Sequence, residues 1–166
     1  MILEGNKIYL RPMTVQDTDD VVRWRNEEFV RNNFIYRGEF TREIHLNWIK
    51  TKVETGEVIQ FIIVEKGTNR SVGSVYLRDI DRDELTGEYG IFIGESDALG
   101  KGYGNEVAVL MVNYSKNELG LSKLFLRLYS ENIPALKSYQ HAGFEIVDGK
   151  TEIKNDKEVI FMEKKL

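Results

Sequence analysis

The stretch that decides the fold is Leu99-Gly100-Lys101-Gly102-Tyr103-Gly104-Asn105-Glu106. It follows a strand-like run from Tyr89 to Ile93 and leads into a helical run that begins near Val107 and ends before Gly120. Alternating glycines allow a sharp turn with unshielded amide hydrogens. The first amides of a helix lack intrahelical partners and lie at the positive end of its dipole. The stretch therefore predicts an anion site suited to a pyrophosphate, with a plain strand-to-helix turn as the alternative.

Two common nucleotide-binding motifs do not fit this stretch. A Walker A loop needs four residues between its first glycine and a Gly-Lys pair, and Gly100-Lys101 lacks that lead-in. A dinucleotide fingerprint that starts at Gly100 or Gly102 needs a glycine at its sixth position, where the chain has Asn105 or Val107. Both motifs are excluded by their spacing.

The amino-acid composition limits which kinds of protein and functional site remain. The 166 residues are expected to form one domain over residues 1–166, and the chain has no cysteine and two histidines, so we expect no disulfide, thiolate chemistry or metal site. With 23 basic and 27 acidic side chains the net charge is −4, and no basic run indicates a nucleic-acid partner. The N-terminus has no signal-peptide pattern, and the longest apolar run, Val107 to Val112, is too short to span a bilayer. We expect a cytoplasmic domain without membrane contact.

Periodicity predicts the order of elements as β-α-α-β-β-β-α-β-α-β-β. The expected strands are 8–11, 60–64, 72–77, 88–93, 123–129, 144–147 and 159–162. The expected helices run from Thr14 to about Asn26, from Thr41 to Gly56, from the glycine stretch to Gly120, and from Pro134 to Gly143. This order predicts an α/β (α+β) fold with a mixed sheet and helices on both faces.

A second group of residues follows the strand 123–129. Asn132 lies in the strand-to-helix turn, Tyr139 lies within the short helix, and Gly143-Phe144 begins the next strand. Taken alone, Asn132 is typical of a helix cap and Tyr139 of a half-buried packing residue.

Together the two stretches resemble the GNAT superfamily of acetyl-CoA-dependent N-acetyltransferases. Its loop pattern, Arg/Gln-x-x-Gly-x-Gly/Ala, is matched by Gly102 and Gly104, although Leu99 stands where the pattern has Arg or Gln. Its second pattern, Asn-x-x-Ala-x-x-x-Tyr-x-x-x-Gly-Phe, is matched at Asn132, Ala135, Tyr139, Gly143 and Phe144. The resemblance covers nearly the whole chain and implies a mostly antiparallel central sheet, with acetyl-CoA as co-substrate.

The resemblance also implies roles for individual residues. The implied cofactor-binding residues are Phe92, Ile93, Gly94, Leu99, Gly100, Lys101, Gly102, Tyr103, Gly104, Asn105 and Asn132. The loop amides would hold the CoA pyrophosphate, and the backbone of residues 92–94 would pair with the pantetheine arm like an added strand. That strand would also offer an amide to the thioester oxygen as it becomes an oxyanion. Asn132 would bind the cofactor or order a water, and Tyr139 would protonate the departing CoA thiolate.

The side that binds the amine is predicted from a narrower resemblance. The start Ile8-Tyr9-Leu10-Arg11-Pro12 and the run 88–95 resemble a branch that includes ribosomal-protein alanine, spermidine and amino-sugar-nucleotide acetyltransferases. Trp24, Arg25 and Asn26 favour the last of these and are expected to bind the substrate, a small-molecule or peptide amine.

Arginines on the first helix and the loop after it indicate an amine that also carries an anionic group, because guanidinium groups suit phosphate or carboxylate. They are Arg23, Arg25, Arg31 and Arg37. A solvated basic face is the alternative.

Glu88 is the candidate general base, with a strand-end surface carboxylate as the alternative. His45 and His141 fall in predicted helices and are expected to be surface or satisfied residues. The predicted function is acetyl transfer to a primary amine by direct attack in a ternary complex. A non-catalytic acetyl-CoA sensor or regulatory module is the alternative, and a Ser/His/acid hydrolase would need a nucleophile-elbow sequence that the chain lacks. A homodimer and a monomer are both left open.

Overall fold

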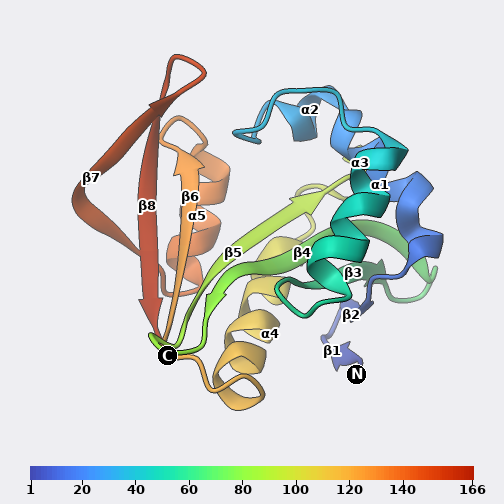
Figure 1. The fold of residues 1–166 in the computed structure, drawn as a ribbon, viewed down its shortest axis with the longest axis horizontal. Coiled ribbons are helices and arrows are strands. Elements are labelled where there is room, and N and C mark those ends of the chain that lie inside the picture. The colour runs from blue at the N-terminus through green and yellow to red at the C-terminus, as the bar shows by residue number, and fades with distance from the viewer.

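A single sheet of eight strands organises the computed structural model, which describes all 166 residues (Figure 1). The strands are β1 (Leu3–Glu4), β2 (Ile8–Pro12), β3 (Ile59–Glu65), β4 (Arg70–Asp81), β5 (Thr86–Ile93), β6 (Lys123–Tyr129), β7 (Glu145–Lys154) and β8 (Lys157–Lys165), in the spatial order β1-β2-β3-β4-β5-β6-β8-β7. The helices are α1 (Thr18–Asn26), α2 (Glu28–Arg31), α3 (Arg42–Trp48), α4 (Tyr103–Asn117) and α5 (Ile133–His141). Short helical turns add η1 (Val15–Asp17), η2 (Ile49–Val53) and η3 (Ser96–Ala98).

The contact between β5 and β6 is the exception in this sheet. Every other neighbouring pair is antiparallel, whereas β5 and β6 are parallel and pair over only three positions, Thr86 with Lys123, Gly87 with Leu124 and Glu88 with Phe125. Beyond Glu88 the two strands diverge (Figure 1). The sheet is therefore continuous at its base and split at the opposite end.

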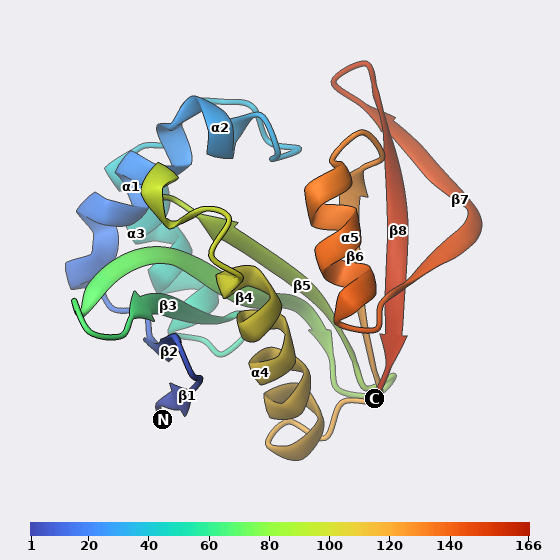
Figure 2. The same ribbon diagram turned by 180° about the vertical axis from the view of Figure 1, so that it is seen from behind.

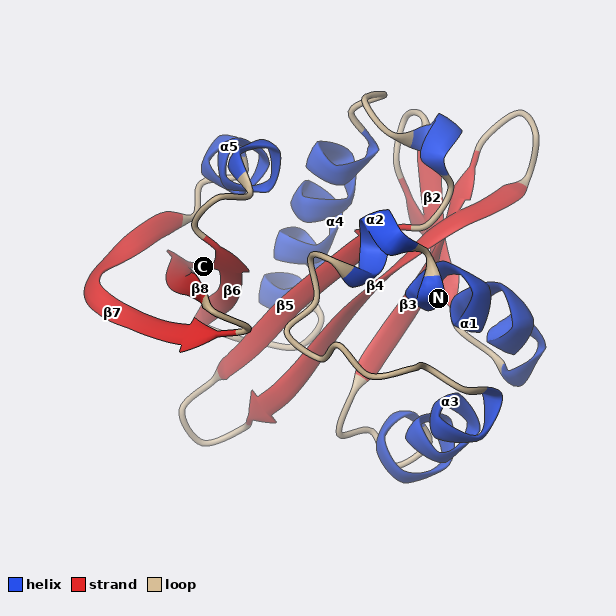
Figure 3. Cartoon of the chain, turned by 90° about the horizontal axis from the view of Figure 1, so that it is seen from above, coloured by secondary structure: helices blue, strands red, loops and turns tan.

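Helices cover both faces of the sheet, as predicted. Viewed from above, α1 and α3 lie on one side of β3, β4 and β5, and α4 lies on the other (Figure 3). From behind, α4 crosses the first half of the sheet and α5 lies beside β6 and β8 (Figure 2). No helix is long and apolar enough to cross a membrane.

Alternating side chains of β3 supply two separate cores. Phe61 and Ile63 belong to the core beneath α4 and α5, while Ile62 and Val64 belong to the core beneath α1, α2 and η2. Successive side chains of a strand point to opposite faces, so a strand buried on both faces reads as an unbroken apolar run. That accounts for the run at residues 61–64.

The predicted element order is confirmed, with differences at the boundaries. Thr41 caps α3 as expected, since its Oγ1 accepts a hydrogen bond from the Ile44 amide at 3.1 Å. The short elements β1 and α2 were not predicted, because two and four residues are too few to show a period. Helix α4 begins at Tyr103 rather than near Val107, so the glycine stretch forms its first turn.

Candidate active site

A cleft of about 1130 Å³ opens where β5 and β6 diverge. One wall comes from β5, the glycine loop and the start of α4, and the opposite wall comes from β6 and α5. Residues of α1, α3 and the loop after α2 line the remaining side. The cleft therefore joins both motifs of the sequence to the first helices.

The glycine loop has the backbone of an anion site. Gly100 and Gly102 have φ angles of +74° and +81°, which residues with a Cβ rarely adopt. Gly102 is the N-cap of α4, and no side chain caps the first turn. The first amides of α4 are therefore available to a ligand.

Gly104 has no such conformational reason to be glycine. A Cβ there would meet only Ser138 Oγ, at an ordinary 3.7 Å. Glycine inside a helix costs about 1 kcal/mol relative to alanine. The bare backbone at Gly104 thus leaves room for a bound group at the first turn of α4.

Several side chains of the loop bind other parts of the protein. The Tyr103 hydroxyl donates to Glu65 Oε2 at 2.6 Å, and this hydrogen bond raises the pKa of Tyr103 to about 12. The Lys101 ammonium lies 3.6 Å from the same carboxylate and does not line the cleft. Asn105 Oδ1 accepts a hydrogen bond from Ser138 Oγ, and Leu99 is half exposed at the cleft wall. The loop therefore lines the cleft with its three glycines and with Leu99, Tyr103 and Asn105.

Strand β5 presents an unpaired edge to the cleft after Glu88. The Gly94 amide donates to the Val72 carbonyl at 2.7 Å, on the side of β4. Backbone groups alternate between the two sides of a strand, so Phe92 also faces β4, while Ile93 and Ile91 direct their amides to the open edge. Of the predicted residues 92–94, only Ile93 has its backbone in position for an added strand. Ile91 joins it, a residue the sequence did not identify.

On β5, Phe92 and Gly94 pack against neighbouring aromatic rings. A Cβ on Gly94 would overlap the Trp24 ring. Phe92 packs edge-on against Trp24 and Phe34, with ring centroids 6.3 and 5.6 Å away. Both residues therefore position β5 by packing.

Tyr139 reaches the cleft from α5. Its ring packs edge-on against Tyr89 and Phe144, with both centroids 6.0 Å away. Burial raises the pKa of Tyr139, and its hydroxyl has no hydrogen-bond partner in the protein. The phenol is therefore protonated at neutral pH and free to donate.

Asn132 caps α5 at the edge of the cleft. Its Oδ1 accepts from the Ala135 amide at 3.4 Å, and its Nδ2 donates to Asn33 Oδ1 at 3.3 Å. The helix-cap alternative is confirmed. A further role toward the cofactor stays a prediction.

Glu88 lies at the base of the cleft, at the last position where β5 pairs with β6. It is 5% exposed, so it is not a surface carboxylate. Its oxygens accept from Arg78 Nε at 3.1 Å and from Arg127 Nε at 2.9 Å. Burial acts to raise the pKa of Glu88, but the two arginines outweigh it and hold that pKa below the ordinary value. Glu88 is thus a carboxylate with little tendency to accept a proton.

Of the three residues expected to bind the substrate, only Arg25 lines the cleft. Trp24 is fully buried, and its Nε1 donates to Glu95 at 2.9 Å. Asn26 exchanges hydrogen bonds with the backbone of Phe40, at 2.7 and 3.0 Å. The prediction of direct substrate contact is therefore corrected for Trp24 and Asn26, whose side chains support the cleft from behind.

His45 was expected to be exposed or satisfied, and the structure contradicts this. It is 1% exposed and neither ring nitrogen has a partner. Burial lowers the pKa of His45 to about 4. His45 precedes buried Ile49 by one helical turn, a spacing that could have placed it on the inner face.

Other cleft residues were also missed. Tyr76 and Arg78 line the cleft from one face of β4, where they alternate with buried residues. Tyr76 lies over Gly90, at which a Cβ would overlap the phenol ring. The alternation of Tyr76 and Arg78 with the apolar Val75 and Leu77 was the available signal.

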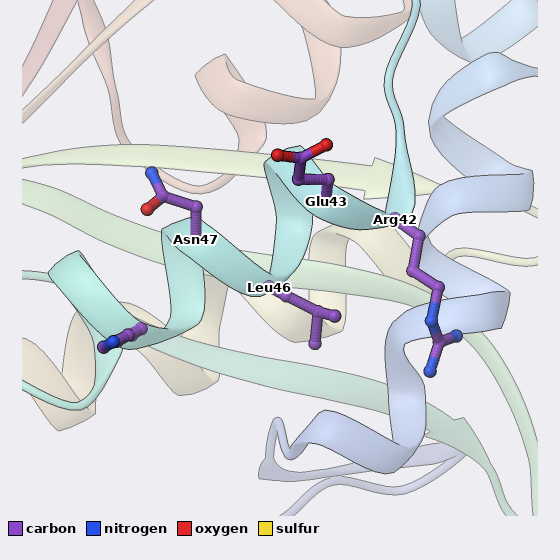
Figure 4. Close-up of a pocket in the computed structure, with 5 residues that line it drawn as sticks. Arg42, Glu43, Leu46 and Asn47 are labelled. Atoms are coloured by element: carbon purple, nitrogen blue, oxygen red, sulfur yellow. The ribbon is translucent and has the colours of Figure 1, made fainter.

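A second hollow, of about 580 Å³, lies on the outer surface of α3. Figure 4 shows Arg42, Glu43, Leu46 and Asn47 projecting from that helix around it. All its lining residues belong to the stretch 42–50, so no second element encloses a ligand there. The cleft between β5 and β6 is the candidate site.

Comparisons with known proteins agree with this geometry. A family model described as an acetyltransferase (GNAT) domain matches residues 7–145. The probable N-acetyltransferase YjcK of Bacillus subtilis (strain 168) is 27% identical over 152 residues, which cover 86% of this chain and 83% of that protein. The alpha/beta-tubulin-N-acetyltransferase 9 of Homo sapiens is 36% identical over 46% of this chain and 37% of that protein.

Solved structures share the fold at low sequence identity. A spermidine N-acetyltransferase from Vibrio cholerae, in complex with CoA and spermine, has a TM-score of 0.88 at 18% identity, covering 96% of this chain and 95% of that chain. A GNAT acetyltransferase from Bacillus anthracis has a TM-score of 0.82 at 19% identity, covering 99% and 98%. With a family model matched over most of its length, the chain belongs to the GNAT acetyltransferase domain family and is an N-acetyltransferase.

Proposed function

We propose that the protein transfers the acetyl group of acetyl-CoA to a primary amine by direct attack in a ternary complex. The observation that carries this proposal is the unpaired edge of β5, which lines the same cleft as the start of α4 and Tyr139. The edge suits an amide-bearing arm, the helix start suits phosphates, and the phenol suits a sulfur leaving group. The chain has no cysteine that could carry the acetyl group as a thioester.

In this reaction the amine nitrogen forms a bond to the thioester carbonyl carbon, and the bond from that carbon to sulfur breaks. The amide of Ile93 or Ile91 would donate to the carbonyl oxygen while it carries negative charge. Tyr139 would give its proton to the sulfur and recover one from solvent. A positioned acid of this kind contributes roughly 10²–10⁴ in rate.

The amine must lose a proton before or during attack. The role of Glu88 as the general base stays a prediction. Its two arginine partners lower the pKa of Glu88 and so make it a weaker base. Water in the open cleft is the competing route for that proton.

The test is turnover with purified protein. Acetyl-CoA is incubated with peptides, polyamines and amino-sugar nucleotides, and both CoA release and the mass of the acetylated amine are measured. Formation of an N-acetyl product supports the proposal. Tight binding of acetyl-CoA without turnover of any amine would instead favour the sensor or regulatory module.

A further inference from the structure

The charge of the cleft differs from that of the whole chain. The chain carries a net charge of −4, yet Glu88 is the single acidic residue that lines the cleft. The basic lining residues are Arg25, Lys52, Arg78, Arg127 and Lys137. The lining of the cleft therefore contains more basic than acidic side chains, although the protein as a whole is negative.

The one acidic group in the lining is itself engaged. Glu88 is bound by both Arg78 and Arg127, and the more exposed Asp79 and Glu152, which do not line the cleft, lie 3.9 and 4.0 Å from the same two arginines. A cationic substrate would find no free carboxylate in the lining of the cleft.

Of the three arginines that line the cleft, only Arg25 makes no ion pair, because Arg78 and Arg127 both bind Glu88. Its guanidinium carbon lies 3.8 Å from the centroid of the Phe34 ring and 4.3 Å from that of Phe40. Burial lowers the pKa of Arg25, and no hydrogen bond to a protein group compensates for it. A largely desolvated guanidinium held by aromatic faces is poised to bind a planar or tetrahedral anion.

The other arginines of this region are already engaged. Arg23 pairs with Glu95 at 2.7 Å on the surface of α1. Arg31 donates to the Arg37 carbonyl at 2.8 Å, and Arg37 donates to the Phe34 carbonyl at 3.0 Å. Arg31 and Arg37 thus brace the loop after α2, and Arg25 alone of the four faces the cleft.

His45 gives an independent sign that this part of the cleft is incomplete. It lines the cleft, its ring centroid is 5.9 Å from that of Phe40, and both its nitrogens are buried without partners. Buried polar groups are almost always hydrogen-bonded, so His45 and Arg25, which both pack against Phe40, form a group of polar side chains without partners on this side of the cleft.

We propose that the amine substrate carries a carboxylate or phosphate group, and that Arg25 binds this group. The inference rests on the proposed acetyl transfer and names its substrate class. It also predicts that polyamines are poor substrates, because their second charge would meet the positive lining of the cleft.

The experiment compares small amines that differ in their tails. The probes are 4-aminobutyrate and phosphoethanolamine as anionic amines, n-butylamine as the neutral amine, and spermidine as the cationic amine. We expect kcat/KM for the better anionic probe to exceed that of n-butylamine at least about tenfold, as for a charge-assisted hydrogen bond. Which anionic probe is better distinguishes carboxylate from phosphate.

Variants of Arg25 test whether this residue causes the preference for anionic amines. Arg25→Gln should remove the preference mainly by raising KM, and Arg25→Lys, which keeps the charge without the fork, should retain part of it. Arg23→Gln is the matched control on the same helix and should keep the preference. A thermal shift with acetyl-CoA checks that each variant is folded.

Calorimetric titration of the same probes into the CoA-saturated protein separates the two proposals. Binding of an anionic probe that is lost in Arg25→Gln supports the inference even if no amine is acetylated, in which case acetyl transfer itself fails. Turnover of n-butylamine or spermidine equal to that of both anionic probes, or a preference unchanged in Arg25→Gln, would overturn the inference. So would the absence of any binding by the anionic probes.

Discussion

Ser138 Oγ donates a hydrogen bond to Asn105 Oδ1 at 2.6 Å and so joins α5 to the first turn of α4. Ser138 directly precedes Tyr139, and Asn105 directly follows Gly104. The proposed acid and the proposed phosphate site are therefore held at a fixed separation by side chains from the two sequence motifs. The two motifs form one unit, although the strand β6 lies between them in the chain.

Replacing Tyr139 by Phe tests the proposed acid. The variant keeps the ring that packs on Tyr89 and Phe144, so acetyl-CoA affinity should change little. Turnover should fall at least about tenfold, since the thiolate would leave without a proton. Single-turnover CoA release and calorimetry measure the two effects.

The matched control is Tyr114→Phe, because Tyr114 packs on Phe61 in the core and does not line the cleft. It should leave turnover unchanged. Parental activity in the Tyr139 variant, under conditions where chemistry limits the rate, would make Tyr139 a packing residue.

Gly104→Ala should move stability and affinity in opposite directions. The added methyl group meets only Ser138 Oγ at 3.7 Å, so the variant should be more stable by up to about 1 kcal/mol. The same methyl group would stand where the backbone approaches a phosphate, so acetyl-CoA affinity should fall. Thermal unfolding and calorimetry together measure both changes.

Gly102→Val serves as the contrast, because its positive φ makes any side chain strained. It should lose both stability and acetyl-CoA binding. Parental acetyl-CoA affinity in the Gly104→Ala variant would show that the first turn of α4 does not contact the cofactor.

Glu88→Gln tests the candidate base. The pKa of Glu88 lies below its ordinary value, so the group is ionised from acidic pH through neutrality and does not titrate between about pH 6 and 9. Activity in that range should rise with pH as the amine loses its proton, and the rise should persist in the variant. Full turnover of the Gln variant near neutral pH would assign the proton to a water relay or another residue.

His45 should make stability depend on pH. Its pKa is about 4 in the folded protein against an ordinary 6.5, so the unfolded chain binds the extra proton in that window. Stability should therefore be complete above about pH 6.5 and fall as the pH drops toward 4, by about 2 kcal/mol at pH 5 from this group. Denaturant unfolding of the parent and of His45→Leu at both ends of the window measures the difference. Equal losses in the two proteins would show that His45 does not carry it.

The sequence predicted those parts of the site that depend on local backbone chemistry. Positive φ at Gly100 and Gly102 and the cap at Asn132 follow from residue type and spacing, so they were identified. The sequence did not predict which amides of β5 face the gap, because this depends on the register between β5 and β4. Ile91 was therefore not among the predicted residues, and Gly94, expected to pair with the cofactor, directs its amide to β4 and lies against Trp24.

Side-chain partners across the sheet were equally inaccessible to sequence reasoning. From the sequence, Glu88 is indistinguishable from a strand-end surface carboxylate. Only the folded structure shows that Arg78 and Arg127, from the two neighbouring strands, bind it. In the sequence, Arg25 is one of four similar arginines. The structure distinguishes it, because the other three make hydrogen bonds to protein groups. Charge in a cleft depends on which groups remain unpaired, and pairing is a property of the tertiary structure.

The short contact between β5 and β6 has a consequence for amide hydrogen exchange in the sheet. Ile91 and Ile93 belong to a central strand, yet their amides point to a gap and should exchange hydrogen with solvent like those at a sheet margin. A ligand arm that pairs there would slow this exchange at alternate residues only. If the proposed pairing holds, the missing strand neighbour of β5 is supplied by the cofactor and not by the protein chain.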